Sequence, residues 1–289
     1  MPRNPEVFYK LAPAKLNLYL HVLDRSNGYH QIESLAVFTQ FGDRVEVSAG
    51  DAISLRIAGP FAAECGPPGE NLVWRAAHAL AAHATAPVGA AITLHKYIPV
   101  AGGLGGGSSD AAAVIRLLMQ LWRLDIKGSA LAELALGLGA DVPVCLRGTP
   151  AIMRGIGEIL SAAPAMPSCY VLLVNPGIAV STKAVFEKLN GRFGMISQPL
   201  PRQISSQKLL ARALNQRSND LQNPAIELAP EIQTVLSALA RQKGCMLARM
   251  SGSGPTCFGL FAGSGDMSTA AEAIRRGLPA YWQAQTRIA

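Results

Sequence analysis

A run rich in glycine, residues 99–112, holds the residues best suited to chemistry in this chain. Five of its six residues from 102 to 107 are glycine, and a stretch of good helix-forming residues follows. Glycine lacks a Cβ atom and reaches backbone angles that other residues avoid, so successive N–H groups can line one concave surface and bind an anion. A helix that begins directly after the loop adds its unpaired N–H groups and the positive end of its dipole. The run therefore predicts a binding site for a nucleotide polyphosphate.

The spacing of this run differs from the two best-known phosphate-binding sequences. A P-loop needs a lysine after its last glycine, and no lysine follows here. The run is denser than the G-x-G-x-x-G pattern, which usually follows the first strand of a dinucleotide-binding domain. A flexible Gly/Ser linker is the structural alternative. The segment 95–100 before the run, which ends in apolar residues, and the helix-forming residues Ala111–Leu124 after it favour a loop inside a domain.

Two groups of polar residues near the N-terminus could recognise a ligand. Lys15 and Asn17 alternate with leucines, so the two polar side chains share one face of a predicted strand. Residues 27–28, Asn-Gly, are typical of a tight turn. Tyr29 and His30 follow it, and a stacking ring beside a hydrogen-bonding imidazole suits a nucleobase. Both groups also have ordinary explanations, because a lone lysine on a strand is usually solvated and a tyrosine after a turn often packs in the core.

Two further segments gain meaning only in combination with the others. Asp141 follows an apolar helical stretch and precedes Val-Pro, where a carboxylate could act as a base or could simply end the helix. Residues 251–256, Ser-Gly-Ser-Gly-Pro-Thr, form a second glycine-rich turn between two predicted strands. A tight hairpin explains that turn equally well, so neither segment alone identifies a function.

Hydrophobic patterning predicts the elements that position these residues. Strands are predicted over Val7–Leu23, Arg44–Ser48, Ile53–Ala58, Ala91–Val100, Ala151–Leu160, Cys169–Asn175, Met246–Met250, Thr256–Phe261 and Tyr281–Ile288. Helices are predicted over Asn71–His83, Ser108–Leu124, Ser129–Leu138, Ser181–Leu189, Pro230–Gln242 and Ser268–Arg276. Asn71 is placed to cap the first helix, and Ser181 or Thr182 the fourth. Strands grouped early and then mixed with helices predict an α+β protein with two domains, 1–161 and 162–289, a linker at 162–168 and a mobile loop at 191–206.

Composition narrows the class of protein. The chain has 289 residues, of which 49% are hydrophobic and 16% charged, which is typical of a globular protein of one or two domains. No apolar run reaches the ~20 residues of a membrane helix, and the first residues lack a signal-peptide core. Five scattered cysteines without a CxxC pair argue against a zinc site or a disulfide framework. The net charge of +7 is compatible with anionic ligands, but the dispersed positive residues disfavour a nucleic-acid partner. We therefore expect a soluble, cytoplasmic protein.

Five segments, taken in order, resemble the GHMP kinase superfamily, which is named for galacto-, homoserine, mevalonate and phosphomevalonate kinases. They are Pro-Ala-Lys-Leu-Asn-Leu at 13–18, Gly-Tyr-His at 28–30, Gly-Gly-Leu-Gly-Gly-Gly-Ser-Ser-Asp-Ala-Ala at 102–112, Gly-Ala-Asp-Val-Pro at 139–143 and Ser-Gly-Ser-Gly-Pro-Thr at 251–256. The resemblance covers residues 10–260. It implies an N-terminal domain like the second domain of ribosomal protein S5, a ferredoxin-like C-terminal domain, and an active site between them.

The activity that the resemblance implies is the transfer of phosphate from ATP to an alcohol. The segments at 13–18 and 28–30 point to a member that phosphorylates the 2-hydroxyl of 4-diphosphocytidyl-2-C-methyl-D-erythritol. The products are the 2-phosphate and ADP, on the non-mevalonate route to isoprenoid precursors. Two alternatives stay open: a sibling kinase acting on homoserine or mevalonate, and a non-catalytic nucleotide-binding regulator. The oligomeric state also stays open.

The resemblance also implies roles for individual residues. Asp141 would accept the proton of the attacking hydroxyl, and Lys15 would keep Asp141 ionised and polarise that hydroxyl. The implied substrate-binding residues are Tyr29 and His30, which would bind the cytosine, and Phe186, which would close the other face of its ring. Asn17 and Thr182 are implied as further contacts to the substrate. The implied ATP-binding residues are Asn71, near the adenosine, and the loop residues Pro99, Val100, Ala101, Gly102, Gly103, Leu104, Gly105, Gly106, Gly107, Ser108 and Ser109.

Two expectations concern charge beside the phosphates. Mg²⁺ is expected to accompany ATP, but no protein carboxylate is identified as its ligand, so ATP and water would hold the ion. Asp110 follows the two serines, where a negative charge would repel phosphate, and we expect it to cap the helix instead.

Overall fold

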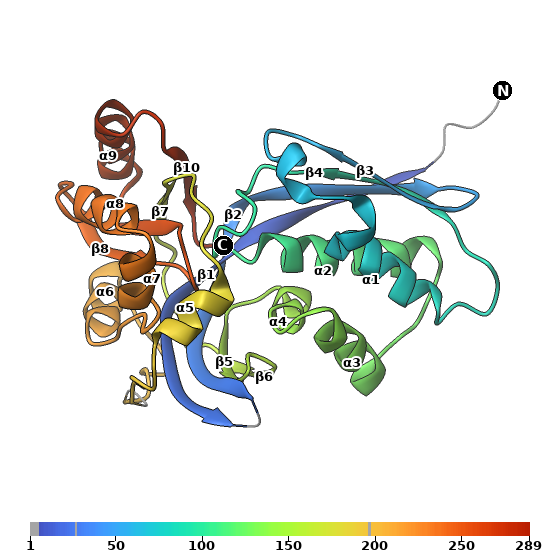
Figure 1. The fold of residues 1–289 in the computed structure, drawn as a ribbon, viewed down its shortest axis with the longest axis horizontal. Helices are drawn as coiled ribbons and strands as arrows, with labels where there is room; N and C mark the ends of the chain where they lie inside the picture. The colour runs from blue at the N-terminus through green and yellow to red at the C-terminus, as the bar shows by residue number, and fades with distance from the viewer. Residues whose placement is uncertain (1–5, 27, 196–197) are drawn as a thin grey trace. The chain divides into compact units, whose positions relative to one another are not determined.

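The computed structural model describes residues 6–26, 28–195 and 198–289. The chain divides into two compact units that alternate along the sequence, and Figure 1 labels their elements. The first comprises Met1–Ala14, Gly42–Val100 and Gly105–Gly148, and the second comprises Lys15–Phe41, Ala101–Leu104 and Thr149–Ala289. The long strands β1 (Val7–Ser26) and β2 (Tyr29–Ala49), which pair with each other, therefore contribute residues to both units.

The first unit contains a sheet with helices on one face (Figure 1). Strand β4 (Ala90–His95) pairs in parallel with β3 (Ile53–Ala58) and antiparallel with the end of β2, where Arg44 lies opposite His95. The helices are α1 (Leu72–Ala81), α2 (Gly106–Leu121), α3 (Gly128–Leu138) and α4 (Val142–Arg147), with short 3-10 turns at Ala62–Cys65 and Pro68–Glu70.

Helix α2 is the central helix of the first unit and carries the end of the glycine run. Its residues 109–115 are all buried, because the helix packs into the core beside α1 and α4. Small alanines in this stretch let neighbouring elements approach closely, while Val45 and Val47 of β2 join the same core. The glycine run therefore leads into an element that tight packing holds in place.

The second unit contains a four-stranded antiparallel sheet in the order β10-β7-β9-β8. The strands are β7 (Tyr170–Asn175), β8 (Cys245–Met250), β9 (Cys257–Phe261) and β10 (Trp282–Arg287). Helix α8 (Glu231–Ala240) packs on β8 and β9, and α9 (Ser264–Gly277) packs on β7 and β10. Taking β7, α8, β8, β9, α9 and β10 in chain order gives the βαββαβ arrangement of a ferredoxin-like domain.

The rest of the second unit carries the first half of β2 and the elements packed beside it. Strand β5 (Ala151–Gly155) pairs antiparallel with β2 and with β6 (Ile159–Ala162). Its remaining helices are α5 (Thr182–Lys188), α6 (Gln207–Asn215) and α7 (Gln222–Leu228). Leu20 and Val22 of β1 pack into one core with the sheet strand β7 and helices α7 and α8.

The α+β class is confirmed, and several element bounds are revised. Strand β2 begins at Tyr29, well before the predicted Arg44, because Ile32–Ala36 pairs with β5. Strand β4 ends at His95 and not at Val100, because β3, its partner in register, ends at Ala58 opposite His95. Helices α4, α6 and α7 were not predicted, being six to nine residues long and so too short for a clear helical period. The domain boundary at 161/162 stays a prediction, and residues 162–168 lie within the second unit.

Candidate active site

The first half of the glycine run, Ala101–Leu104, is held by hydrogen bonds from segments remote in the sequence. Its carbonyl oxygens accept hydrogen bonds from the Lys15 N–H at 2.8 Å, from Ser251 Oγ at 2.9 Å and from the Thr256 N–H at 3.2 Å. The structure therefore brings together three of the segments singled out in the sequence: the strand with Lys15, the glycine run and the second glycine-rich turn.

Gly103 is the residue in this part of the loop where only glycine fits. Its φ angle is +74°, a conformation that residues with a side chain rarely adopt. A Cβ atom there would overlap the carbonyl oxygen of Ser251 and would lie 2.8 Å from that of Gly254. The close approach of the two glycine-rich segments thus depends on the missing side chain.

The second half of the run, Gly105–Ser109, turns into helix α2. Gly105 has a φ angle of +61° directly before the helix and has no side chain with which to cap it. The N–H groups of the first helical turn therefore stay available for an anion, as expected for a phosphate site. Ser108 is half-buried, whereas Ser109 is buried and its N–H donates to the Gly105 carbonyl oxygen at 2.9 Å.

Lys15 and Asn17 are buried together on the same face of β1. Lys15 is 3% exposed and Asn17 is 1% exposed. Lys15 Nζ donates to Asn17 Oδ1 at 3.0 Å, Asn17 Nδ2 donates to Ser34 Oγ at 2.7 Å, and the Asn17 N–H donates to Ser251 Oγ at 3.2 Å. The interpretation of Lys15 as an ordinary solvated lysine is therefore wrong. Its side chain is held by a partner on its own strand, and that partner is held by two others.

Asp141 lies between two helices, α3 and α4, and not at the end of a single one. Helix α3 ends at Leu138 and α4 begins at Val142, so Asp141 directly precedes α4. Its side chain makes no capping hydrogen bond to that helix and is half-buried. Asp141 belongs to the first unit and Lys15 to the second.

The predicted cytosine-binding residues lie together in the second unit. The His30 and Phe186 rings are stacked with centroids 4.8 Å apart, and Phe193 meets His30 edge-on at 6.3 Å. Tyr29, which precedes His30 in the sequence, is 63% exposed. Burial, together with the nearby charge of Arg25, lowers the pKa of His30, which favours a neutral imidazole that can donate and accept. Phe193 was missed because only the fold brings its loop to His30.

Two predicted N-terminal caps are confirmed, and one predicted turn is not described. Asn71 Oδ1 accepts from the Val73 N–H at 2.9 Å at the start of α1. Ser181, and not Thr182, caps α5, and Thr182 Oγ1 lies 2.7 Å from Ser253 Oγ of the second glycine-rich turn. Of the Asn-Gly turn, Asn27 lies outside the described residues.

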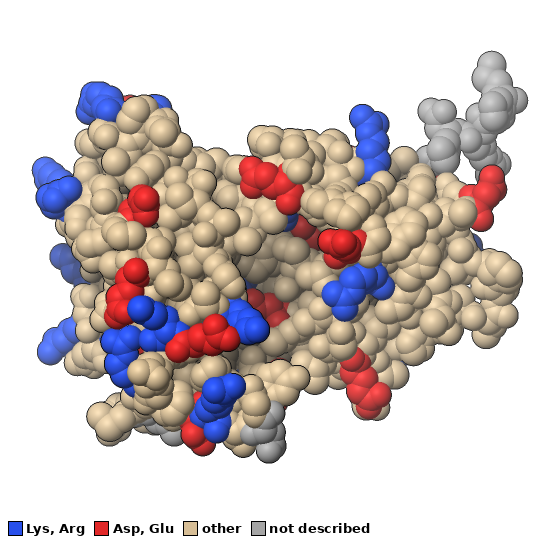
Figure 2. Space-filling model, in the orientation of Figure 1, with Lys and Arg blue, Asp and Glu red and all other residues tan. Residues whose placement is uncertain are grey.

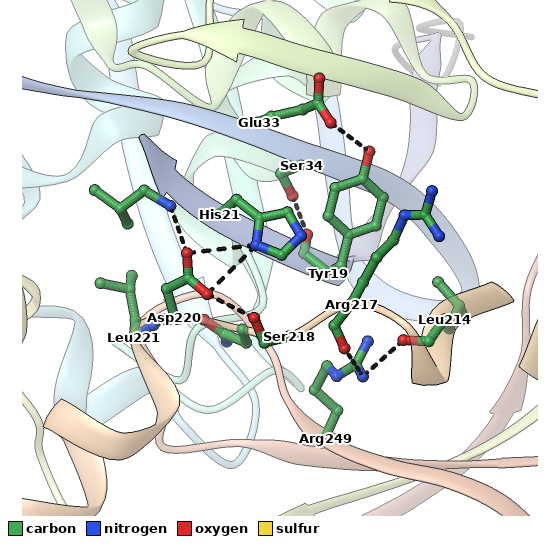
Figure 3. Close-up of polar contacts among 12 residues, drawn as sticks. Tyr19, His21, Glu33, Ser34, Leu214, Arg217, Ser218, Asp220, Leu221 and Arg249 are labelled. Carbon is green, nitrogen blue, oxygen red and sulfur yellow. Dashed lines mark hydrogen bonds and ion pairs between the residues drawn. The ribbon is translucent and has the colours of Figure 1, made fainter. Parts of the chain in front are cut away.

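A partly buried network, absent from the sequence predictions, fixes the strand that carries Lys15 and Asn17 (Figure 3). His21 Nδ1 lies 3.4 Å from both carboxylate oxygens of Asp220, which also accepts from the Val22 N–H at 2.9 Å and from Ser218 Oγ at 2.6 Å. Burial alone would raise the pKa of Asp220, but these hydrogen bonds lower it below its ordinary value. The carboxylate therefore stays ionised and anchors β1.

Arg249 adds a second anchor to the same strand. It is buried, and its guanidinium donates to three carbonyl oxygens: those of Leu18 at 2.7 Å, Leu214 at 3.0 Å and Arg217 at 2.6 Å. Burial and the nearby charge of Arg217 lower the pKa of Arg249 to about 10. The segment that bears Lys15 is thus fixed by contacts more than two hundred residues away.

Asp110 does not cap helix α2, contrary to the sequence-based expectation. It is 1% exposed in the second turn, and its Oδ2 accepts from Lys96 Nζ at 2.8 Å. Lys96 Nζ also donates to Asp43 Oδ2 at 2.5 Å, so two carboxylates share one ammonium. Burial, which the charge of Lys96 only partly offsets, raises the pKa of Asp110 to about 7, and the charge of Asp43 acts in the same direction.

We expect this raised pKa to make the stability of the protein depend on pH. In the folded state Asp110 keeps its proton up to about pH 7, whereas an unfolded aspartate loses it near pH 3.9. Between these two pH values the folded state binds more protons than the unfolded state, so the contribution of Asp110 to stability falls as pH rises. Above about pH 7 both states have lost the proton, and the contribution no longer changes with pH. Thermal unfolding from about pH 5 to about pH 8 should therefore show a melting-temperature difference between wild type and Asp110→Asn that falls and then levels off. A difference independent of pH would contradict the assignment.

Neither a metal cluster nor a membrane helix occurs among the described residues. Residues 6–26, 28–195 and 198–289 contain no group of three or more His, Cys, Asp or Glu side chains placed to hold a metal ion. Within the same ranges, no helix has both the length and the apolar character needed to cross a membrane. On the face drawn in Figure 2, basic and acidic side chains are mixed and do not gather into a patch of one sign.

Two family models match the chain on either side of residue 161. The model described as the GHMP kinases N terminal domain matches residues 71–149, and the model described as GHMP kinases C terminal matches residues 202–283. The first match includes the glycine run and Asp141. The second includes the turn at 251–256.

Relatives and solved structures agree with these matches. The chain is 46% identical to a 4-diphosphocytidyl-2-C-methyl-D-erythritol kinase from Paramagnetospirillum magneticum, over 96% of this chain and 97% of that protein. It is 47% identical to the enzyme of the same name from Cereibacter sphaeroides, over 96% and 98%. A crystal structure of 4-(cytidine 5'-diphospho)-2C-methyl-D-erythritol kinase matches with a TM-score of 0.80 and 36% identity, over 98% of this chain and 100% of that one. A homoserine kinase structure from Cytophaga hutchinsonii, at 18% identity, TM-score 0.70, 100% of this chain and 96% of that one, shares the fold.

Proposed function

The chain belongs to the GHMP kinases and, within them, to the 4-diphosphocytidyl-2-C-methyl-D-erythritol kinases, and on this basis we propose that it phosphorylates the 2-hydroxyl of 4-diphosphocytidyl-2-C-methyl-D-erythritol. ATP is the phosphate donor, and the products are the 2-phosphate and ADP. The reaction is one step on the non-mevalonate route to isoprenoid precursors. The observation that carries the proposal is identity of 46% to a kinase of that name over nearly the whole length of both chains.

Asp141 and Lys15 have the catalytic roles in this proposal. Asp141 accepts the proton of the attacking hydroxyl, and Lys15 favours the ionised carboxylate and polarises the hydroxyl. The support for Lys15 is that it is held in one orientation by Asn17 although it is buried. The support for Asp141 is its place directly before α4, where its side chain is half-buried. Asn17 then has two functions, to orient Lys15 and to contact the substrate.

The glycine run binds the phosphates of ATP in this proposal. Residues Pro99–Ser109 surround them, the residues after Pro99 offer their backbone N–H groups, and the start of α2 adds its dipole. Asn71, fixed by its cap to α1, lies near the adenosine. Magnesium arrives as part of the MgATP substrate, held by the ATP oxygens and water, while the hydroxyls of Ser108 and Ser109 add to the neutralisation of charge.

The stacked rings of the second unit bind the cytosine in this proposal. His30 supplies a hydrogen-bonding edge, Tyr29 and Phe186 supply ring faces, and Thr182 contacts the substrate beyond the base. The support is the contact of His30 with Phe186 and the exposure of the Tyr29 ring. An alcohol without a base, such as homoserine or mevalonate, would need none of these rings.

Replacing Tyr29 by alanine should weaken the binding of the cytidyl substrate and leave the binding of ATP unaffected. Stacking of one base on an aromatic ring is worth about 1–3 kcal/mol, so we expect KM for the cytidyl substrate to rise roughly 10- to 100-fold. Steady-state kinetics with each substrate varied in turn would measure this. Tyr9→Ala is the matched control, since Tyr9 is also exposed on a strand. An equal rise in both KM values would contradict the assignment.

A coupled assay of ADP release tests the proposed reaction directly. The purified protein is given ATP with the cytidyl substrate, with homoserine or with mevalonate, and we expect turnover with the first alone. Turnover with homoserine or mevalonate would favour a sibling kinase. ATP binding without ADP release from any alcohol would favour a nucleotide-binding regulator. Location in the cytoplasm and the lack of a nucleic-acid partner stay predictions.

A further inference from the structure

Asp43, Lys96 and Asp110 form a buried charge cluster that the proposed chemistry does not use. Their side chains are 0%, 5% and 2% exposed. Each comes from a different place in the first unit: Asp43 from β2, Lys96 from the residue after β4, and Asp110 from the second turn of α2. The pairing of β2 with β4 explains how Asp43 meets Lys96, because Arg44 lies opposite His95 and these two residues directly follow that last pair of the ladder.

The cluster contacts both ends of the glycine run. Before the run, Asp43 Oδ1 accepts from the Tyr97 N–H at 2.5 Å and from the Ile98 N–H at 2.8 Å. After the run, Lys96 Nζ donates to Asp110 of α2. One ammonium and its two carboxylates therefore connect the segment that enters the run to the helix that leaves it.

Gly106 shows how closely the cluster approaches the start of α2. A Cβ atom at this position would lie 2.9 Å from Lys96 Nζ and 3.5 Å from Asp43 Oδ2. The ammonium thus packs directly against the first residue of the helix, at the end whose N–H groups are proposed to bind phosphate. A small shift of Lys96 would leave this first turn without its support.

The charge balance of the cluster is a poor way to stabilise a fold. Two carboxylates share one ammonium out of contact with water, and buried ion pairs of this kind often add nothing over apolar side chains of the same size. Asp110 Oδ1 has no hydrogen-bond partner among the described residues, which adds a further cost. Cys65 is a titratable group close enough to feel the charges of the cluster, and burial raises the pKa of its thiol, so it brings no negative charge at neutral pH.

We propose that Asp43, Lys96 and Asp110 are positioning residues for ATP, with Lys96 tying the two ends of the phosphate loop to each other. The proposal rests on the assignment of Pro99–Ser109 as that loop. A loop of glycines loses much conformational entropy when it orders, so backbone N–H groups bind phosphate well only if both ends of the loop are already fixed. The cluster fixes both ends before ATP arrives, and its cost in stability is offset by tighter binding of ATP.

Two neutral replacements of Asp110 separate this role from a general effect on stability. Asp110→Asn and Asp110→Leu have similar size, and each leaves Lys96 paired with Asp43. Only the asparagine can still accept a hydrogen bond from Lys96. A hydrogen bond to a charged group is worth about 1.5–3 kcal/mol, so we expect Asp110→Leu to raise KM for ATP at least roughly 10-fold above that of Asp110→Asn. The KM for the cytidyl substrate should change less than about twofold in both variants.

Lys96→Met extends the test to the ammonium itself, with Lys127→Met as the matched control. Lys127 is exposed at the start of α3 in the same unit, and its loss should change neither KM. Lys96→Met should raise KM for ATP at least as much as Asp110→Leu. Titration calorimetry with MgATP, without the alcohol, should rank the variants by dissociation constant in the same order as their KM values for ATP. Circular dichroism establishes which variants are folded. Should Lys96→Met not fold, the Asp110 pair still decides the question.

Two outcomes would overturn the proposal. One is a folded Asp110→Leu variant whose KM for ATP lies within about twofold of that of Asp110→Asn. The other is a rise in both KM values in parallel with a loss of thermal stability, which a merely structural role would produce. Gly103→Ala, measured in the same series, identifies failure of the loop assignment itself. If Gly103→Ala leaves the KM for ATP normal, the loop does not bind phosphate. If Gly103→Ala raises the KM for ATP and the Asp110 variants do not, only the role of the cluster is refuted.

Discussion

Replacing Asp141 by asparagine lowers kcat roughly 10²- to 10⁴-fold and leaves ATP binding close to that of wild type. The amide has nearly the size and shape of the carboxylate but cannot accept the proton of the attacking hydroxyl at neutral pH. Because Asp141 makes no capping hydrogen bond to α4, the change should not disturb the helix it precedes. The effect should therefore appear in kcat and not in the KM for ATP.

The measurement is steady-state kinetics with each substrate varied in turn, together with MgATP binding by calorimetry. Asp125→Asn is the matched control, since Asp125 is an exposed aspartate in the same unit. Turnover near the wild-type value in Asp141→Asn would remove Asp141 from the mechanism.

Replacing Gly103 by alanine should raise the KM for ATP by about 100-fold, because misplacing a binding group by about 1 Å has an effect of that size. The added Cβ atom would overlap the backbone of Ser251, which cannot turn aside as a side chain could. The φ angle of +74° adds strain to any residue with a Cβ atom. The loop would have to move away from the turn at 251–256, and its N–H groups would move with it.

The control for Gly103→Ala is Gly265→Ala, in the first turn of α9. Gly265 belongs to the same unit, and an added Cβ atom there meets nothing within 4 Å. Thermal unfolding of both variants separates a loss of ATP use from a loss of folding. A folded Gly103→Ala variant with the wild-type KM for ATP would show that this loop is not the phosphate site.

Local patterns predicted much of the fold because they act within a few residues. The alternation in β3 and the cap at Asn71 depend on neighbours, and both match the structure. Strand β2 was largely missed because its first half pairs with β5, more than a hundred residues away. Phe193 was missed for the same reason, since the aromatic ring beside it, His30, is distant in the sequence.

The sequence by itself determined the chemistry of the glycine run and the order of the segments that identify the family. Glycine, lysine and aspartate have their properties wherever they stand, and their spacing is preserved in a linear chain. Only the tertiary structure decided what surrounds them. It placed Ser251 and Thr256 on the loop carbonyl groups and set Asp110 on Lys96. These contacts arise from strand pairing and core packing, which join residues without regard to their separation in the chain, so no local pattern could have predicted them.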